Sequence, residues 1–438
     1  MRNFFLLIGI LSIIGCSSNK KQSVQNEIQD CMSVINLSGD ISKVSSLFLS
    51  DAAAKVEVIP LEVTDESMLG DISHLHVTDQ DIWVHQYKDS YIYRFSRTGK
   101  FLNKVGKIGQ GPEEYIRIHD FFVDDNSKEL YLQTTTPAGL KVYGYNGQFK
   151  RIASRRSLDD VCNTVYIQSV LYDNKFFLAQ NLAFLNKPMP KDSMWSFALV
   201  DSTYQKKKTF KNPAHIGREE EILQHRVDFS KFVNYWKESF TSIDTYNNQL
   251  TLKFPDTDTI YQYNSANDEL VPQYAIFTTE EKGDYGATHA FVRERSSLDY
   301  FCIRHYYPTK YFIYLLGSKG EDIYTYCYDR RDGSVRVKRL KSEITERPSQ
   351  HGIFHTLKDA DNFVLDNDLC GGAFNVDFRS QGKYWIDVLE PGSTDDWINI
   401  DEVKDSKVKD DAQKQRFVST LENVEEEANP ILIIATLK

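Results

Sequence analysis

Histidines and carboxylates at short spacings are the first candidates for chemistry in this sequence. His74 and His76, two residues apart on an expected strand, would place two imidazoles on one face, which suits a metal ion. The plainer interpretation is that the two histidines are exposed, or buried in the core with a hydrogen-bond partner. Asp256-Thr257-Asp258 resembles part of a calcium loop but lacks its central glycine and distal glutamate, so a hairpin turn fits better. Calcium is therefore conceivable without a supporting motif, and no metal ligand or cofactor is assigned.

The common catalytic and nucleotide-binding signatures are absent from the sequence. It contains no P-loop, no Rossmann glycine pattern, no nucleophile-elbow serine and no HExxH zinc motif, so no catalytic residue is assigned. The net charge of −10 argues against a nucleic-acid partner, because phosphate binding requires clustered Lys and Arg. The one basic triplet, Lys206-Lys207-Lys208, fits a solvated hairpin turn.

The elements that must position any site are short strands separated by polar turns. An aromatic or aliphatic strand followed by a turn recurs six times, at intervals of 50 to 64 residues. Four short strands with their turns need roughly 40 to 50 residues, the length of a propeller blade, so the longer intervals contain insertions. A pair of β-sandwiches is the alternative, and the even spread of the repeat disfavours it. The markers of the repeat are Phe95, Tyr145, Leu199, Tyr263, Tyr326 and Val376.

Three segments together resemble a known family. They are residues 101–115, with Phe101-Leu102, Val105-Gly106 and the run Gly109-Gln110-Gly111-Pro112-Glu113-Glu114-Tyr115, residues 56–62, and Asn429-Pro430-Ile431-Leu432. This combination resembles the six-bladed β-propeller lipoproteins of Bacteroidetes, distant relatives of NHL-repeat propellers and largely of unknown function. The family usually has an acidic residue where this chain has Ala428. The resemblance implies an all-β, six-bladed propeller with four antiparallel strands per blade, and it implies no reaction.

The glycine-rich run suggests a place for ligand contacts. Glycine accepts positive φ and proline fixes φ, so Gly109-Gln110-Gly111-Pro112 must turn sharply. Connectors between blades are expected to approach the central channel, where Gln110, Glu113 and Tyr115 would line a polar pocket. The alternative is that the run merely turns the chain and that Tyr115 packs between blades.

The two ends of the chain predict where the protein is located in the cell and how the ring of blades closes. Residues 1–15 read as an export signal peptide, and Cys16 follows the apolar run as in a bacterial lipobox. Acyl chains on Cys16 would anchor residues 16–50, a polar tether, to a membrane. The propeller is expected at residues 51–438, with a charged helix in residues 404–427 and residues 431–437 joining the strand at 56–62 to close the ring. A further helix is expected at residues 218–236.

Cysteine usage adds one conditional expectation. Five cysteines remain after lipidation, an odd number without CxxC spacing. Cys302 and Cys327 fall in one expected blade and could pair in an oxidising periplasm. Cys31, Cys162 and Cys370 are expected to be small buried hydrophobic residues.

Two functions are compatible with this sequence. The favoured one is a lipid-anchored binding or scaffold propeller in the cell envelope, at the outer membrane facing the periplasm, that engages a glycan, a peptide or a partner protein through one face. No acidic cluster follows Cys16, so the sequence assigns no signal for display on the outer surface, and display itself stays open. The alternative is a metal-dependent propeller enzyme of the lactonase, esterase or glycan lyase type, with a site in the central channel. Three or more acidic groups with a metal at the channel mouth would favour the enzyme.

Overall fold

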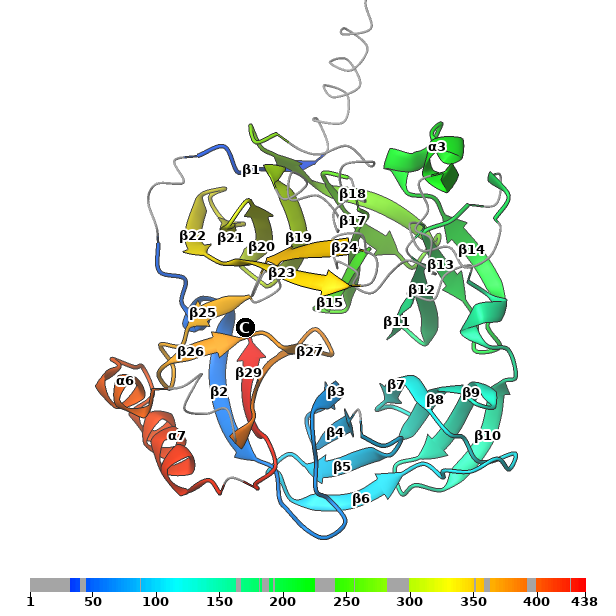
Figure 1. The fold of residues 1–438 in the computed structure, drawn as a ribbon, viewed down its shortest axis with the longest axis horizontal. Helices are drawn as coiled ribbons and strands as arrows, with labels where there is room; N and C mark the ends of the chain where they lie inside the picture. The colour runs from blue at the N-terminus through cyan, green and yellow to red at the C-terminus, as the bar shows by residue number, and fades with distance from the viewer. Residues whose placement is uncertain are drawn as a thin grey trace, which may run out of the picture.

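Six β-sheet blades form a closed ring in the computed structural model of the chain (Figure 1). The structure describes residues 32–39, 45–86, 88–162, 167–180, 182, 189–191, 194–224, 241–255, 257–281, 299–349, 352–357, 363–391, 399–425 and 427–438. The predicted six-bladed propeller is therefore confirmed. The expected export signal and Cys16 lie outside the described residues, as does Asp256.

Each of the first three blades is a four-stranded antiparallel meander. Blade 1 contains β3 (Ile72–Val77), β4 (Asp81–Gln86), β5 (Ile92–Ser96) and β6 (Phe101–Val105). Blade 2 contains β7 (Ile118–Asp124), β8 (Glu129–Thr135), β9 (Ala138–Gly144) and β10 (Phe149–Ser154). Blade 3 contains β11 (Ile167–Tyr172), β12 (Lys175–Gln180), β13 (Phe197–Val200) and β14 (Lys206–Phe210). Short helical segments η1 (Leu158–Asp160), η4 (Pro213–His215) and α3 (Glu219–Gln224) flank blade 3.

Blade 4 carries a fifth strand that comes from the expected tether. Its meander is β15 (Ser242–Tyr246), β16 (Gln249–Lys253), β17 (Thr259–Asn264) and β18 (Glu269–Phe277), and β1 (Ser33–Asn36) pairs with β18 in parallel. Ile35 of β1 is fully buried against blades 4 and 5. The ordered body thus begins before residue 51, because one buried side chain and a parallel pairing to a distant edge give no local alternation to detect.

Blade 5 and the last blade complete the ring. Blade 5 contains β19 (Cys302–Pro308), β20 (Phe312–Lys319), β21 (Asp322–Asp329) and β22 (Val335–Lys341). The hairpins β23 (Ile344–Ser349) with β24 (Gly352–Leu357), and β25 (Val364–Asp366) with β26 (Ala373–Asn375), follow it. Blade 6 contains β27 (Phe378–Ser380), β28 (Tyr384–Leu389), β29 (Ile431–Leu437) and, as its outermost strand, β2 (Ala53–Pro60).

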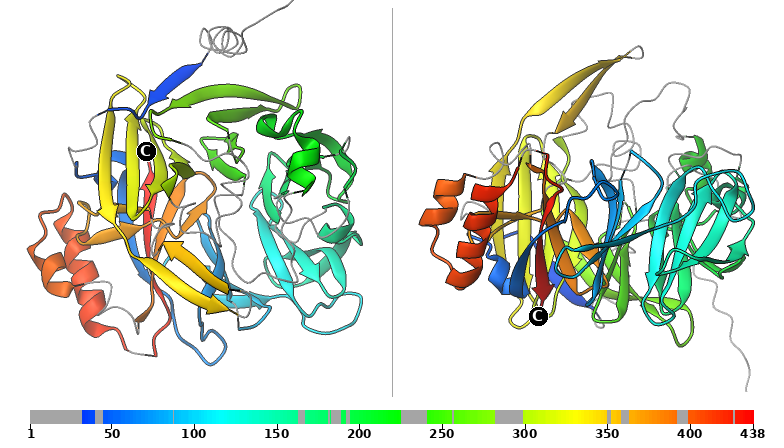
Figure 2. Two further views of the ribbon diagram at one scale, coloured as in Figure 1. Left: turned by 45° about the horizontal axis from the view of Figure 1, so that its top comes forward. Right: turned by 90° about the horizontal axis from the view of Figure 1, so that it is seen from below.

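Closure of the ring follows the prediction. β2 pairs with the C-terminal strand β29 in antiparallel register, from Ala53 opposite Leu437 to Pro60 opposite Ile431. The helices α6 (Ile400–Asp405) and α7 (Asp411–Asn423) lie outside this blade, next to β2 (Figure 2), and α2 (Leu49–Ala52) leads into it. The charged C-terminal helix expected in residues 404–427 is present over the shorter range of α7, and Phe417 and Leu421 bury its apolar side.

One marker of the predicted repeat was wrong. The first five markers lie in or next to the third strands of blades 1 to 5, whereas Val376 follows β26, which pairs with β25 in a separate hairpin. The third strand of blade 6 is β29. The helices α6 and α7 are inserted before β29 in the sequence. Phe374 is buried, so the sequence of β26 resembles that of a blade strand.

Cys302 and Cys327, which could have paired, do not form a disulfide. Cys302 lies on β19 and Cys327 on β21, and β20 separates these strands. The Cys327 sulfur instead accepts a hydrogen bond from Arg336 Nη2 (3.4 Å), and burial raises the pKa of its thiol to about 11. Cys162 and Cys370 are buried as expected.

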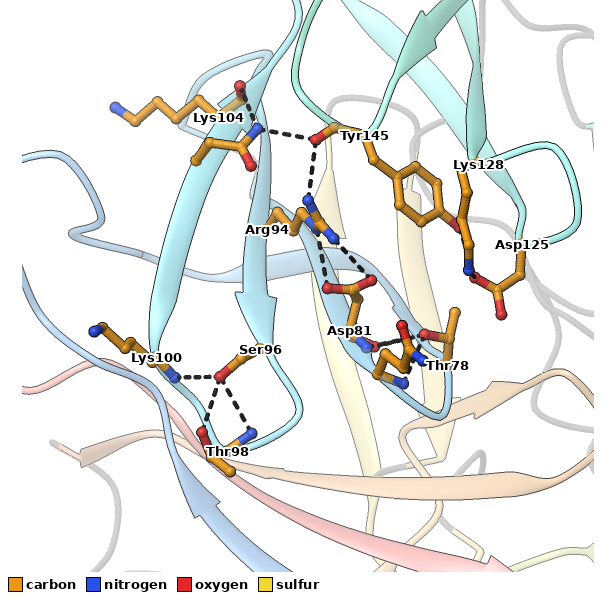
Figure 3. A network of polar contacts seen from close by, with 12 residues as sticks. Thr78, Asp81, Arg94, Ser96, Thr98, Lys100, Lys104, Asp125, Lys128 and Tyr145 are labelled. Atoms are coloured by element: carbon orange, nitrogen blue, oxygen red, sulfur yellow. Dashed lines mark hydrogen bonds and ion pairs between the residues drawn. The ribbon is translucent and has the colours of Figure 1, made fainter.

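Blade-to-blade contacts combine apolar packing with buried polar links. Between blades 1 and 2, Arg94 donates to both carboxylate oxygens of Asp81 (2.9 and 3.1 Å) and to the Tyr145 carbonyl (3.4 Å) (Figure 3). Its guanidinium also lies over the rings of Trp83 and Tyr145.

Among the described residues, no helix has the length and apolar character needed to cross a bilayer.

Candidate functional site

The connector between blades 1 and 2, residues 106–117, begins at a glycine that no other residue can replace without strain. Gly106 has φ +115°, and a Cβ atom built there would lie 1.8 Å from the hydroxyl oxygen of Tyr115. That hydroxyl donates to the Ser90 carbonyl at 2.8 Å, and the Tyr115 side chain is fully buried. Tyr115 therefore fastens the connector to blade 1.

Hydrogen bonds within the connector and to blade 2 fix the rest of it. The Tyr115 amide donates to the Lys107 carbonyl, and the Gly109 amide donates to the Tyr115 carbonyl, both at 3.0 Å. The Glu114 carboxylate accepts the Gly111 amide at 2.9 Å, and this bond and Lys107 lower the pKa of Glu114. On blade 2, the Tyr143 hydroxyl donates to the Glu113 carbonyl. The connector is thus held from both sides.

An open groove lies between the connector and the outer strand of blade 2. Its volume is about 570 Å³. The connector forms one wall, and β10 and the residues that follow it form the other. We call this space the groove; its lining residues are Pro112, Glu113, Phe149, Ile152, Ala153 and Arg155.

Charged groups of both signs border the groove. The Arg155 side chain is exposed, and the Glu113 carboxylate, 53 % exposed, lies 4.0 Å from Lys107 Nζ. Beneath the groove, Lys141 is opposite Ile152 in the β9–β10 pairing and only 3 % exposed. Its ammonium donates to the Pro112 carbonyl at 3.3 Å, and burial, together with nearby Arg155, lowers its pKa. A buried ammonium held by a neutral carbonyl leaves positive potential at this end of the groove.

The structure separates the three predicted contact residues. Glu113 lines the groove, Gln110 is exposed on the turn, and Tyr115 packs between blades, the alternative that the sequence left open. The expected position at the channel was wrong for this part of the connector, because Pro112 and Glu113 contact β9 and line the groove with β10. These are the outer two strands of blade 2. The reason is the apolar stack of Tyr115, Tyr143 and Phe149, whose edge-to-face rings draw the connector outward.

Sequence reasoning missed Lys141, Phe149 and Arg155. The available signal was Lys141 itself, a lysine inside the apolar run Leu140–Tyr145, where a charge needs a specific partner. Arg155 follows a strand end in a polar stretch, and nothing local distinguishes it from the adjacent Arg156.

The channel wall forms a second group of polar side chains, supplied by the innermost strands. His74 Nε2 lies 3.8 Å from Asp120 Oδ1, and Ser169 Oγ donates to Asp120 Oδ2 at 3.3 Å, so blades 1, 2 and 3 meet there. Burial raises the pKa of Asp120 despite the nearby His74 and His119. Elsewhere on the wall, Arg379 of blade 6 forms an ion pair with Asp244 of blade 4.

The two histidines considered for a metal differ in environment. His74 borders the channel, with 40 % of its side chain exposed, whereas burial lowers the pKa of His76 to about 4. His85, opposite His74 in the β3–β4 pairing, has its pKa lowered by burial to about 4 as well. In the described part of the chain, no three His, Cys, Asp or Glu side chains are grouped as a metal ion would require.

Fold and groove together define a six-bladed propeller with a preformed lateral groove. The chain belongs to the family described as a domain of unknown function, DUF4934, which matches residues 32–436.

Two solved structures of Bacteroides proteins align with this chain at low identity. A Bacteroides fragilis protein provisionally named as exported aligns with a TM-score of 0.58 and 16 % identity, over 93 % of this chain and all of the other. A member of the DUF4221 family from Bacteroides vulgatus aligns with a TM-score of 0.42 and 13 % identity, over 69 % of this chain and 91 % of the other. No curated protein matches the chain.

Proposed function

We propose that the protein is a binding or scaffold propeller of the cell envelope that engages a glycan, a peptide or a partner protein through the groove beside the connector. The observation that carries this proposal is the rigidity of the groove's wall. Gly106 and Tyr115 fix the connector against blade 1, and the bond from Lys141 to the Pro112 carbonyl fixes it against blade 2. Preorganised walls lower the ordering cost of binding.

The proposed cellular location rests on the N-terminal sequence. The export signal in residues 1–15 and the lipobox cysteine Cys16 support lipid anchoring, at the outer membrane facing the periplasm. The B. fragilis structure, provisionally named as exported, agrees with export. The membrane is then a partner through the anchor, and the propeller itself presents the groove to soluble ligands.

A metal-dependent enzyme with a channel site is the second candidate. The charged channel wall, with the His74–Asp120 and Arg379–Asp244 pairs, is the observation in its favour. Calcium would need oxygen ligands from several blades.

A thermal-shift panel separates the two functions. The chain from residue 17 onward, which contains every described residue, is tested with calcium, a glycan panel and short peptides. A ligand at about a hundred times its Kd stabilises the folded state by about 2.7 kcal/mol. A shift with one glycan or peptide class that Glu113→Gln abolishes supports the groove. A calcium shift that EDTA reverses, unaffected by Glu113→Gln, supports the channel enzyme instead.

A further inference from the structure

We propose that the groove recognises the C-terminal carboxylate of an extended peptide whose last side chain is apolar. This inference rests on the proposed binding function and names the ligand class of the same groove. Three features of the groove carry it: a cationic end, apolar surface on both walls and an acidic side chain on the connector.

The cationic end consists of Arg155 and Lys141. Arg155 is exposed, and in the described part of the chain its guanidinium makes no hydrogen bond or ion pair, so its donors are available. Lys141 lies beneath it, buried and bonded, among the described residues, only to the neutral Pro112 carbonyl. A planar guanidinium matches a carboxylate with two parallel hydrogen bonds, and the buried ammonium adds attraction in a region of low dielectric.

The apolar surface of the two walls is suited to an aliphatic side chain more than to a sugar ring. Ile152, Ala153 and Pro112 contribute aliphatic surface, and the one aromatic ring of the lining, Phe149, packs edge-to-face against Tyr143 with ring centroids 5.5 Å apart. Exposed aliphatic residues at a groove with a few charges are typical of peptide sites.

Glu113 sets a charge preference further along the peptide. Its carboxylate is exposed, and its contact with Lys107 at 4.0 Å is weak. An acidic residue two positions before the peptide's last residue would be repelled, and a basic residue there would be favoured.

The test compares matched peptides on the chain from residue 17 onward. Acetyl-Lys-Ala-Leu with a free carboxylate and the same peptide as its amide are titrated by calorimetry or by fluorescence of a labelled copy. We expect the acid to bind and the amide to bind about 10- to 100-fold more weakly, the range for hydrogen bonds to charged groups. An acetyl-Glu-Ala-Leu acid should bind more weakly than its lysine counterpart.

Variants locate the contact. Arg155→Gln should lose most of the difference between acid and amide, with Lys141 supplying the rest, and Arg155→Lys should recover part of the loss through charge alone. The matched control is Arg156→Gln, next in sequence, exposed, and absent from the groove lining, which should bind like the parent protein. Circular dichroism confirms that each variant is folded.

The outcomes separate this inference from the proposed function. Equal binding of acid and amide, with Glu113→Gln still weakening both, overturns carboxylate recognition and keeps the groove. Binding of uronic-acid oligosaccharides but no peptide overturns the peptide class and keeps the binding function. Failure of every peptide and glycan to bind the folded protein overturns carboxylate recognition and leaves a partner protein as the remaining ligand class of the proposed function.

Discussion

Replacing Gly106 by alanine should loosen the connector far more than a glycine substitution usually does. The added Cβ would lie 1.8 Å from Tyr115 Oη and 2.9 Å from Tyr115 Cζ, so the ring must leave its position. Alanine at positive φ costs about 1–2 kcal/mol. Loss of the bond from the Tyr115 hydroxyl to Ser90, with a buried donor left unpaired, costs about 1–3 kcal/mol more. The expected total is about 2–5 kcal/mol.

Gly217→Ala provides the matched control. Gly217 also has positive φ, at +81°, but no atom lies within 4 Å of the position that a Cβ would take, so only the backbone cost applies. The difference between the two variants isolates the clash with Tyr115, about 1–3 kcal/mol. Urea unfolding measures the global part, and hydrogen–deuterium exchange of residues 106–117 measures the local part, where faster exchange is expected in Gly106→Ala alone.

A double-mutant cycle with Tyr115→Phe tests the cause. Phenylalanine removes the hydroxyl that the new Cβ would strike, so Gly106→Ala should cost less in the Tyr115→Phe background than in the parent protein. Strictly additive costs, or a Gly106→Ala variant no less stable than Gly217→Ala, would refute the claim that Tyr115 fixes the connector through this close approach.

Three further perturbations address the ring itself. His76 and His85 have folded-state pKa values of about 4, below the unfolded value of about 6.5, so stability should be complete above pH 6.5 and fall as the pH drops toward 4. Urea midpoints should show a shallower fall in His85→Gln. Arg94→Met leaves the buried Asp81 carboxylate without its partner and should lower the unfolding free energy by about 3–5 kcal/mol. The double variant Arg94→Met with Asp81→Leu should recover much of this loss. No recovery would contradict the pairing. Ser380→Ala removes the hydroxyl that accepts from the Val77 amide and donates to its carbonyl, both at 2.8 Å, and should cost about 2 kcal/mol in urea unfolding, against almost nothing for exposed Ser38→Ala.

Short sequence patterns predicted the architecture because each blade is built mostly from strands that are close together in the sequence. Each meander pairs strands that follow one another in sequence, so the alternation around Phe95 or Tyr145 is enough to place a third strand. Closure by β2 and β29 was predictable for a different reason, since a ring with open edges must join its ends. The pattern failed at Val376, where a buried phenylalanine in a small hairpin imitates a blade strand.

The candidate site was predictable only in part. The glycines and proline of the connector showed that a fixed turn exists, and Glu113 does line the groove. The other wall comes from β10 and Arg155, in a later part of the chain, and depends on how the rings of Tyr143 and Phe149 pack. Such packing has no period in the sequence, so the side of the blade on which the connector lies could not be predicted.

The groove and the closure of the ring draw on different parts of the chain. Every residue that lines the groove falls between Pro112 and Arg155, on the connector and on blade 2, whereas closure joins β2 to β29 in blade 6. Variants of Glu113 or Arg155 should therefore change binding without changing the unfolding free energy, because both side chains are exposed. Gly106 and Tyr115 affect both ligand binding and stability. The bond from Tyr115 to Ser90, which shapes the groove, also fastens the connector of blade 2 to blade 1. A loss of binding in Gly106→Ala thus reports on the wall of the groove, and a loss in Arg155→Gln reports on the ligand.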